Sequence, residues 1–155
     1  MAARDLARAL RGVRAIALDT SAILAAGDAS DPRRSCSEWL LERISSGRLE
    51  ATISAVTASE LMVRPLLAEQ IDEALALQAL LTTYPHLDIH AFTATTAAII
   101  AGVRARTRLK TPDACVIAAA LETGAAAIVH GDRDLARAAG QYPDLRFVDL
   151  TELCA

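Results

Sequence analysis

Five acidic residues lie after a predicted strand or on a helix next to one: Asp19, Glu60, Asp113, Asp132 and Asp134. Singly, each has an ordinary explanation, because acids are favoured as helix caps and in first turns. Together, several carboxylates a few ångströms apart would repel one another unless they were protonated or bridged by a cation. Hard oxygen ligands suit Mg²⁺ or Mn²⁺. The set therefore indicates a divalent metal site.

Metal-assisted hydrolysis is a chemistry that such a site supports, because metal ions polarise a substrate oxygen and activate water without a nucleophilic side chain. The absence of a Ser–His or Cys–His motif agrees with it. Thr20 and Ser21 are candidates to hydrogen-bond the ligands, and both also suit helix capping. Three basic residues near the last acids are either phosphate contacts or solvated surface charge: Arg108, Lys110 and Arg133.

The hydrophobic pattern predicts strands that alternate with helices. Strands are expected at 13–18, 49–53, 87–90, 125–130 and 146–148, with helices at 3–12, 22–26, 35–46, 54–63, 66–82, 93–106, 111–122 and 132–139. Pro65 is expected to break or bend the chain. Alternation of this kind predicts one α/β domain, with a central parallel sheet of four to five strands flanked by helices. Ligands of such sheets bind beyond the carboxyl ends of the strands.

Composition narrows the function classes. The 155 residues suit a single domain, and their 53% apolar content excludes disorder. The net charge of −3 argues against a protein that coats nucleic acid non-specifically. Without the five candidate acids, however, 14 acidic residues remain against 16 basic ones. The acidic surplus is therefore assigned to the proposed site.

Cys36, Cys115 and Cys154 are odd in number, far apart and without a C-x-x-C pair. We therefore expect neither a disulfide framework nor a zinc site, and a reducing cytoplasm as the location. Cys115 and His130 are expected to pack in the core. The sequence contains neither a convincing signal peptide nor an apolar stretch long enough for a membrane span.

Four short motifs occur in order: Asp19-Thr20-Ser21, Ser59-Glu60-Leu61, Thr111-Pro112-Asp113-Ala114 and Gly131-Asp132-Arg133-Asp134-Leu135. In this order and spacing they resemble the PIN domain, and in particular the VapC-type toxin ribonucleases of toxin–antitoxin pairs. The resemblance covers residues 14–150, which leaves 1–13 as an N-terminal helical extension and 151–155 as a C-terminal tail. The chain departs from the family at His130, where Thr is frequent, and at Leu135, where Phe is common.

The resemblance implies an endoribonuclease that uses Mg²⁺ or Mn²⁺ to hydrolyse RNA with metal-activated water, leaving a 5′-phosphate and a 3′-hydroxyl. Asp19, Glu60, Asp113 and Asp132 match the acidic quartet, and Asp134 matches a further acid that supports the metal. The resemblance also implies a homodimer and inhibition by a cognate VapB-like antitoxin.

Three other interpretations stay open. A haloacid-dehalogenase-type phosphatase or a phospho-accepting receiver also carries acids at strand ends. However, the phosphatase needs Asp-x-Asp where Ser21 stands, and both need a late Lys, whereas the single Lys110 precedes Asp113. A PIN-fold binding module without catalysis is disfavoured because all the acids are present. A housekeeping PIN nuclease without an antitoxin is distinguished by the neighbouring gene.

Overall fold

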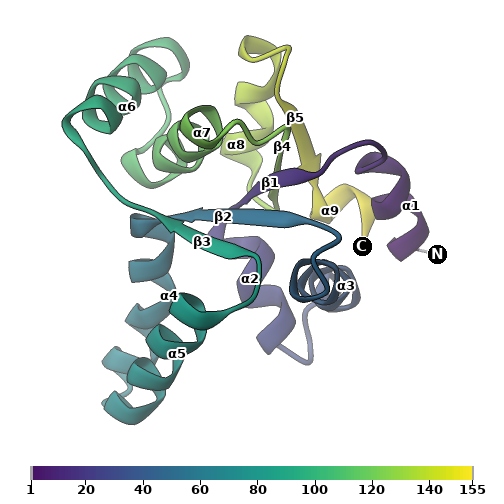
Figure 1. Cartoon of the computed structure of the whole chain (residues 1–155), viewed down its shortest axis with the longest axis vertical. Coiled ribbons are helices and arrows are strands. Elements are labelled where there is room, and N and C mark those ends of the chain that lie inside the picture. The colour runs from purple at the N-terminus through teal and green to yellow at the C-terminus, as the bar shows by residue number, and fades with distance from the viewer. Residues whose placement is uncertain (1, 155) are drawn as a thin grey trace.

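The computed structural model describes residues 2–154 and contains a parallel five-stranded sheet. Its strands are β1 (Ala15–Leu18), β2 (Glu50–Ser54), β3 (Leu87–His90), β4 (Ala127–His130) and β5 (Arg146–Asp149). They lie in the order β3-β2-β1-β4-β5, and every neighbouring pair is parallel (Figure 1). This arrangement confirms the predicted α/β fold and its parallel sheet.

Helices cover both faces of the sheet (Figure 1). One layer contains α2 (Thr20–Gly27), α3 (Arg34–Ser45), α4 (Ala55–Leu67) and α5 (Ile71–Thr83), and the other contains α6 (Ala94–Thr107), α7 (Thr111–Thr123) and α8 (Arg133–Ala138). A short 3-10 turn, η1 (Ala139–Gln141), follows α8. Each layer packs its own apolar cluster against the sheet.

The helix α7 is buried along most of its length because its sequence is dominated by small residues. Every residue from 114 to 120 is buried. Pro112 lies in the first turn of the helix without losing a bond, since the first N–H groups of a helix have no intrahelical partner. Gly124 ends it in the left-handed conformation that glycine adopts at no steric cost. Asp113 is thereby fixed in the first turn.

The two ends of the described chain pack together. Leu6 and Leu10 of the N-terminal segment are buried in the same cluster as Leu150 and Cys154. Helix α1 (Ala2–Ala9) contacts both α3 and α9 (Leu150–Leu153). The segments expected to extend the domain therefore add to its core. Residues 1 and 155 of the predicted extension and tail lie outside the described residues.

Pro65 does not end its helix where the sequence pattern predicted. It lies inside α4, which continues to Leu67 because the N–H of Ala68 bonds to the carbonyl of Arg64. The chain turns at Glu69, whose φ is 57°. As a result α5 begins at Ile71, five residues later than the predicted helix. A proline in the last turns of an exposed helix removes one backbone bond without stopping it.

The expectation that no disulfide forms is wrong. Cys36 and Cys154 are 118 residues apart but form a disulfide, because the start of α3 and the end of α9 lie in one apolar cluster. Cys115 is the free cysteine and is buried, as predicted. Disulfides seldom persist in a reducing cytoplasm. The expected cytoplasmic location rested on unpaired cysteines, so the Cys36–Cys154 disulfide removes its basis.

The structure also bears on a membrane-spanning segment. Within residues 2–154, no helix is both long enough and apolar enough to cross a bilayer.

The disulfide predicts one reactive thiol in denatured, unreduced protein and three after reduction, counted by alkylation and mass spectrometry. Cys36→Ser should lower the free energy of unfolding by about 4 kcal/mol, because the cross-link restricts the unfolded chain. Cys115→Ala is the matched control, since it should leave the stability difference between oxidised and reduced protein intact. Three alkylated thiols without reductant would contradict the disulfide.

Candidate metal centre

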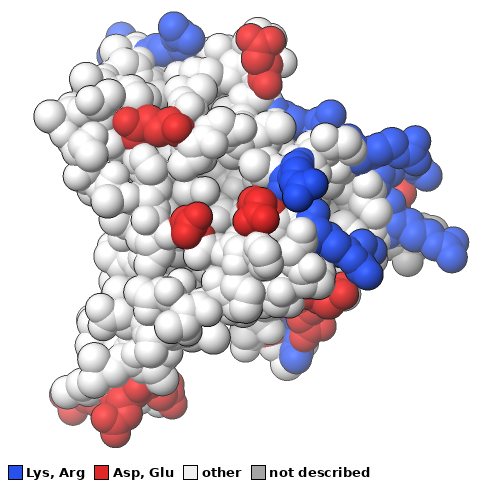
Figure 2. Space-filling model, in the orientation of Figure 1, with Lys and Arg blue, Asp and Glu red and all other residues white. Residues whose placement is uncertain are grey.

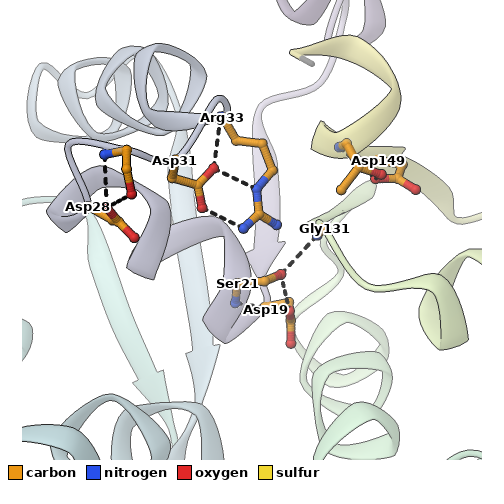
Figure 3. Close-up of polar contacts among 9 residues, drawn as sticks. Asp19, Ser21, Asp28, Asp31, Arg33, Gly131 and Asp149 are labelled. Atoms are coloured by element: carbon orange, nitrogen blue, oxygen red, sulfur yellow. Dashed lines mark hydrogen bonds and ion pairs between the residues drawn. The ribbon is translucent and has the colours of Figure 1, made fainter.

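Asp19 follows β1 and is held by the turn that begins α2. Its carboxylate accepts hydrogen bonds from the Ser21 backbone N–H, at 3.0 Å, and from the Ser21 hydroxyl. The same hydroxyl accepts a bond of 2.8 Å from the Gly131 N–H, which joins this turn to the one after β4 (Figure 3). Asp19 is only 7% exposed. Asp19 therefore caps α2, and Ser21 orients its buried carboxylate.

The sheet register sets the residues beside Asp19. Leu18 pairs with Val129, and His130 pairs with Asp149 on the next strand. The Asp19 N–H extends the ladder by bonding to the Val129 carbonyl at 3.0 Å. Asp19, His130 and Asp149 consequently lie in a row along the carboxyl edge of three adjacent strands. This is the edge at which ligands of parallel sheets bind.

Three further acids converge beside this row. Asp113, Asp132 and Asp134 each offer a carboxylate oxygen, and these oxygens all lie within 4.8 Å of one another. Asp132 caps α8 by accepting from the N–H groups of Asp134, at 2.6 Å, and Leu135, at 3.3 Å. Asp134 pairs with Arg137 one turn later. Helix α7 presents Asp113 to the pair from the other side of the cluster.

Glu60 reaches the site from α4. The Thr20 hydroxyl donates to Glu60 Oε2 at 2.5 Å, so Thr20 fixes this carboxylate as Ser21 fixes Asp19. Glu60 also contributes to the negative potential at Asp113. The residues predicted to support the ligands, Thr20 and Ser21, therefore both contact a candidate acid.

Electrostatic crowding is visible at Asp113. Burial and then, in decreasing order, the charges of Asp132, Asp19, Asp134 and Glu60 together raise the pKa of its carboxyl to about 6. Like charges that are partly removed from water favour the protonated form. A bound cation would reverse this preference by supplying the missing positive charge. The donor set thus fits a hard divalent cation, with Asp113, Asp132 and Asp134 as its most closely grouped ligands.

The remaining predicted residues occupy distinct places. His130 is fully buried, and its Nδ1 accepts from the Asp132 N–H at 3.2 Å, which agrees with a packed core histidine. Burial lowers the pKa of this imidazole. Arg108 and Lys110 line a cavity together with Asp134, whereas Arg133 is exposed at the start of α8.

Sequence reasoning missed two charged residues at this edge. Asp149 ends β5 and caps α9, accepting from the Thr151 N–H at 2.8 Å. The signal was its position after an apolar strand, but the predicted strand stopped one residue earlier. Arg33 lies in the loop before α3, where no local pattern points to the site.

The raised pKa of Asp113 predicts a pH-dependent cost in the metal-free protein. The folded state holds the proton more tightly than the unfolded chain, so stability falls as pH rises from about 4 to about 6. In chelator at neutral pH, Asp113→Asn should raise the free energy of unfolding by about 1–2 kcal/mol, allowing for solvent screening. The gain should vanish near pH 4.

Chemical denaturation across this pH range measures the effect. Asp144→Asn, at an exposed loop acid before β5, is the matched control and should change stability little. An Asp113→Asn protein no more stable than the wild type at neutral pH would contradict the crowding.

Comparisons with known proteins agree with the fold of this chain. The family model described as "PIN domain" matches residues 16–141. FitAcB from Neisseria gonorrhoeae is 21% identical, with a TM-score of 0.65 over 89% of this chain and 99% of that one. VapC20 from Mycobacterium tuberculosis is 21% identical, with a TM-score of 0.62 over 79% and 94%. VapBC2 from Rickettsia felis is 14% identical, with a TM-score of 0.64 over 87% and 98%. No curated protein matches significantly. On the family match, the chain belongs to the PIN domain family.

Proposed function

We propose that this protein is an endoribonuclease that depends on Mg²⁺, with Mn²⁺ as an alternative cation. The observation that carries the proposal is the convergence of Asp113, Asp132 and Asp134 beside the buried Asp19. Helix capping accounts for Asp19 and Asp132 singly, but the meeting of several like charges at one place is costly without a cation. Family membership supports the same proposal, because the acids occupy the motifs that resemble the catalytic quartet of this family.

In this proposal, some side chains bind the cation and others hold the carboxylates in position. Asp113, Asp132 and Asp134 would hold the cation most closely, and Asp19 and Glu60 would complete the set of five acids. Thr20 and Ser21 fix the last two carboxylates through hydroxyl hydrogen bonds, which limits their rotation. When bound, the cation supplies Lewis-acid polarisation of the scissile phosphate and a lowered pKa for coordinated water. Below a pH of about 6, Asp113 must release its proton for the site to load.

RNA would approach through the basic residues around the cluster. Arg108 and Lys110 line a cavity next to Asp134, so they are placed to contact phosphates on that side. Arg133 is exposed beside Asp132 and is a third candidate contact. The positive charges of these side chains would offset the repulsion between the acidic cluster and the RNA backbone.

We further propose that the nuclease is a toxin controlled by a VapB-like antitoxin and that it forms a homodimer. The similar structures include VapC20, described as a sarcin–ricin loop cleaving toxin, and a toxin–antitoxin complex from Klebsiella pneumoniae. On this chain, α4 and α5 form an arm whose face in Figure 2 carries few charged residues apart from acids near its tip. Several large apolar side chains are exposed along it: Val63, Leu66, Leu67, Ile71, Leu75 and Leu80. Such a surface favours a protein partner.

The purified protein should cleave single-stranded RNA when Mg²⁺ or Mn²⁺ is present and stop when a chelator is added. Asp19→Asn and Asp113→Asn should each lower the cleavage rate by about a hundredfold or more, because each removes a charge from the metal site. Asp144→Asn should cleave like the wild type. Gel analysis of labelled RNA measures all four proteins, and full activity in both site variants would refute the assignment.

Induced expression should arrest growth, and co-expression of the upstream small open reading frame should restore it. Because arrest requires catalysis, the Asp113→Asn protein should be harmless at the same expression level. Growth curves measure the effect. A harmless wild-type protein that still cleaves RNA in vitro would identify a housekeeping nuclease, and one that binds RNA without cleaving it would identify a silent binding module.

A further inference from the structure

Arg33 is held rigidly at the edge of the metal centre. Its Nε donates to Asp31 Oδ1 at 2.9 Å, and its Nη2 donates to Asp31 Oδ2 at 2.6 Å. The backbone N–H of Arg33 bonds to the same carboxylate at 2.8 Å. The side chains of the pair are only 20% and 13% exposed. A two-point bond of this kind fixes the plane of the guanidinium and leaves one edge of it available.

The free edge points into the site. None of the hydrogen bonds among residues 2–154 involves Nη1 of Arg33, which lies toward Gly131 and the turn of Asp19 and Ser21, with Asp149 across from it (Figure 3). A Cβ on Gly131 would lie 2.1 Å from this nitrogen. A methyl group at this position would force the end of the Arg33 side chain to move, so the glycine lets the guanidinium approach the turn that follows β4.

The charge of Arg33 faces acids that it does not bind. The hydrogen bond to Asp31, followed by the charges of Asp31, Asp149 and Asp19, raises the pKa of the guanidinium against the opposing effect of burial. Among the described residues, its ion pair within 4 Å is with Asp31 alone. Arg33 thus places a fixed positive charge, with unused N–H donors, next to the acidic cluster.

We propose that Nη1 of Arg33 donates to a phosphate oxygen of the RNA strand where the strand passes Asp19 and Asp149. This inference rests on the proposed ribonuclease function and adds a substrate-binding residue to it. Lys110 and Arg108 lie beside Asp134, so Arg33 supplies a cation at a different part of the cluster. A phosphate has the oxygen geometry and the charge that an arginine edge recognises. Asp31 is then a positioning residue for Arg33.

Steady-state cleavage of a labelled single-stranded RNA in Mg²⁺ tests the contact. Arg33→Gln should raise KM about tenfold and change kcat little, because a phosphate contact away from the reacting atoms contributes uniform binding. The salt dependence of log(kcat/KM) should become shallower by about 0.7. Arg33→Lys should restore part of the affinity through its charge. Arg34→Gln is the matched control, since this neighbour pairs with Glu38 and should leave KM unchanged.

Gly131→Ala provides an independent test that keeps Arg33 in the chain. The added methyl should displace Nη1 and raise KM to the level of Arg33→Gln, and the double variant should be no worse than either single one. Melting temperatures separate binding from folding. If folded Arg33→Gln and Gly131→Ala both kept the wild-type KM and salt dependence, the inference about Arg33 would be overturned. The proposed ribonuclease function would still stand, provided that the wild type cleaves the RNA. A wild type that neither binds nor cleaves RNA would overturn both.

Discussion

The mutual repulsion of carboxylates at one edge of the sheet is the constraint on which the rest of the site depends. Parallel strands bring their carboxyl ends to this edge, and the chain places acids after β1 and β4 and in the first turn of α7. Folding therefore forces like charges together, and the pKa of Asp113 rises to about 6 in response. A divalent cation is the chemical partner that relieves this repulsion while all the acids stay ionised.

Local hydrogen bonds hold the crowded acids in place in the metal-free protein. Asp19 and Asp132 are helix caps, so backbone N–H groups and helix dipoles at α2 and α8 offset part of their charge. The observed capping role and the proposed metal-binding role are therefore compatible in the same side chain. Ser21 connects the two turns through Gly131, and Arg33 passes over that glycine. Loss of any of these contacts should therefore change the positions of several of the candidate acids.

The strands could be predicted because they are short apolar runs in the sequence. The candidate acids could be predicted because they follow such runs or stand at the start of a helix. Asp19 and Asp132 each follow a predicted strand, and Asp113 stands in the helix start Thr111-Pro112-Asp113. What could not be predicted depends on tertiary contacts. The disulfide joins residues 118 positions apart, and Arg33 reaches the site only because Asp31 and Gly131 orient it. Asp149 was missed by one residue at a strand boundary, and Pro65 was tolerated because its helix is largely exposed there.

The central claim is that the crowded carboxylates form a divalent metal site. Anomalous X-ray diffraction from crystals soaked in Mn²⁺ tests it most directly, because the signal locates the ion without reference to activity. The account predicts one strong anomalous peak or a close pair within coordination distance of Asp113 and Asp132, and no such peak in crystals of Asp113→Asn. A wild-type crystal with no peak at this cluster, or with Mn²⁺ bound only elsewhere on the molecule, would contradict it.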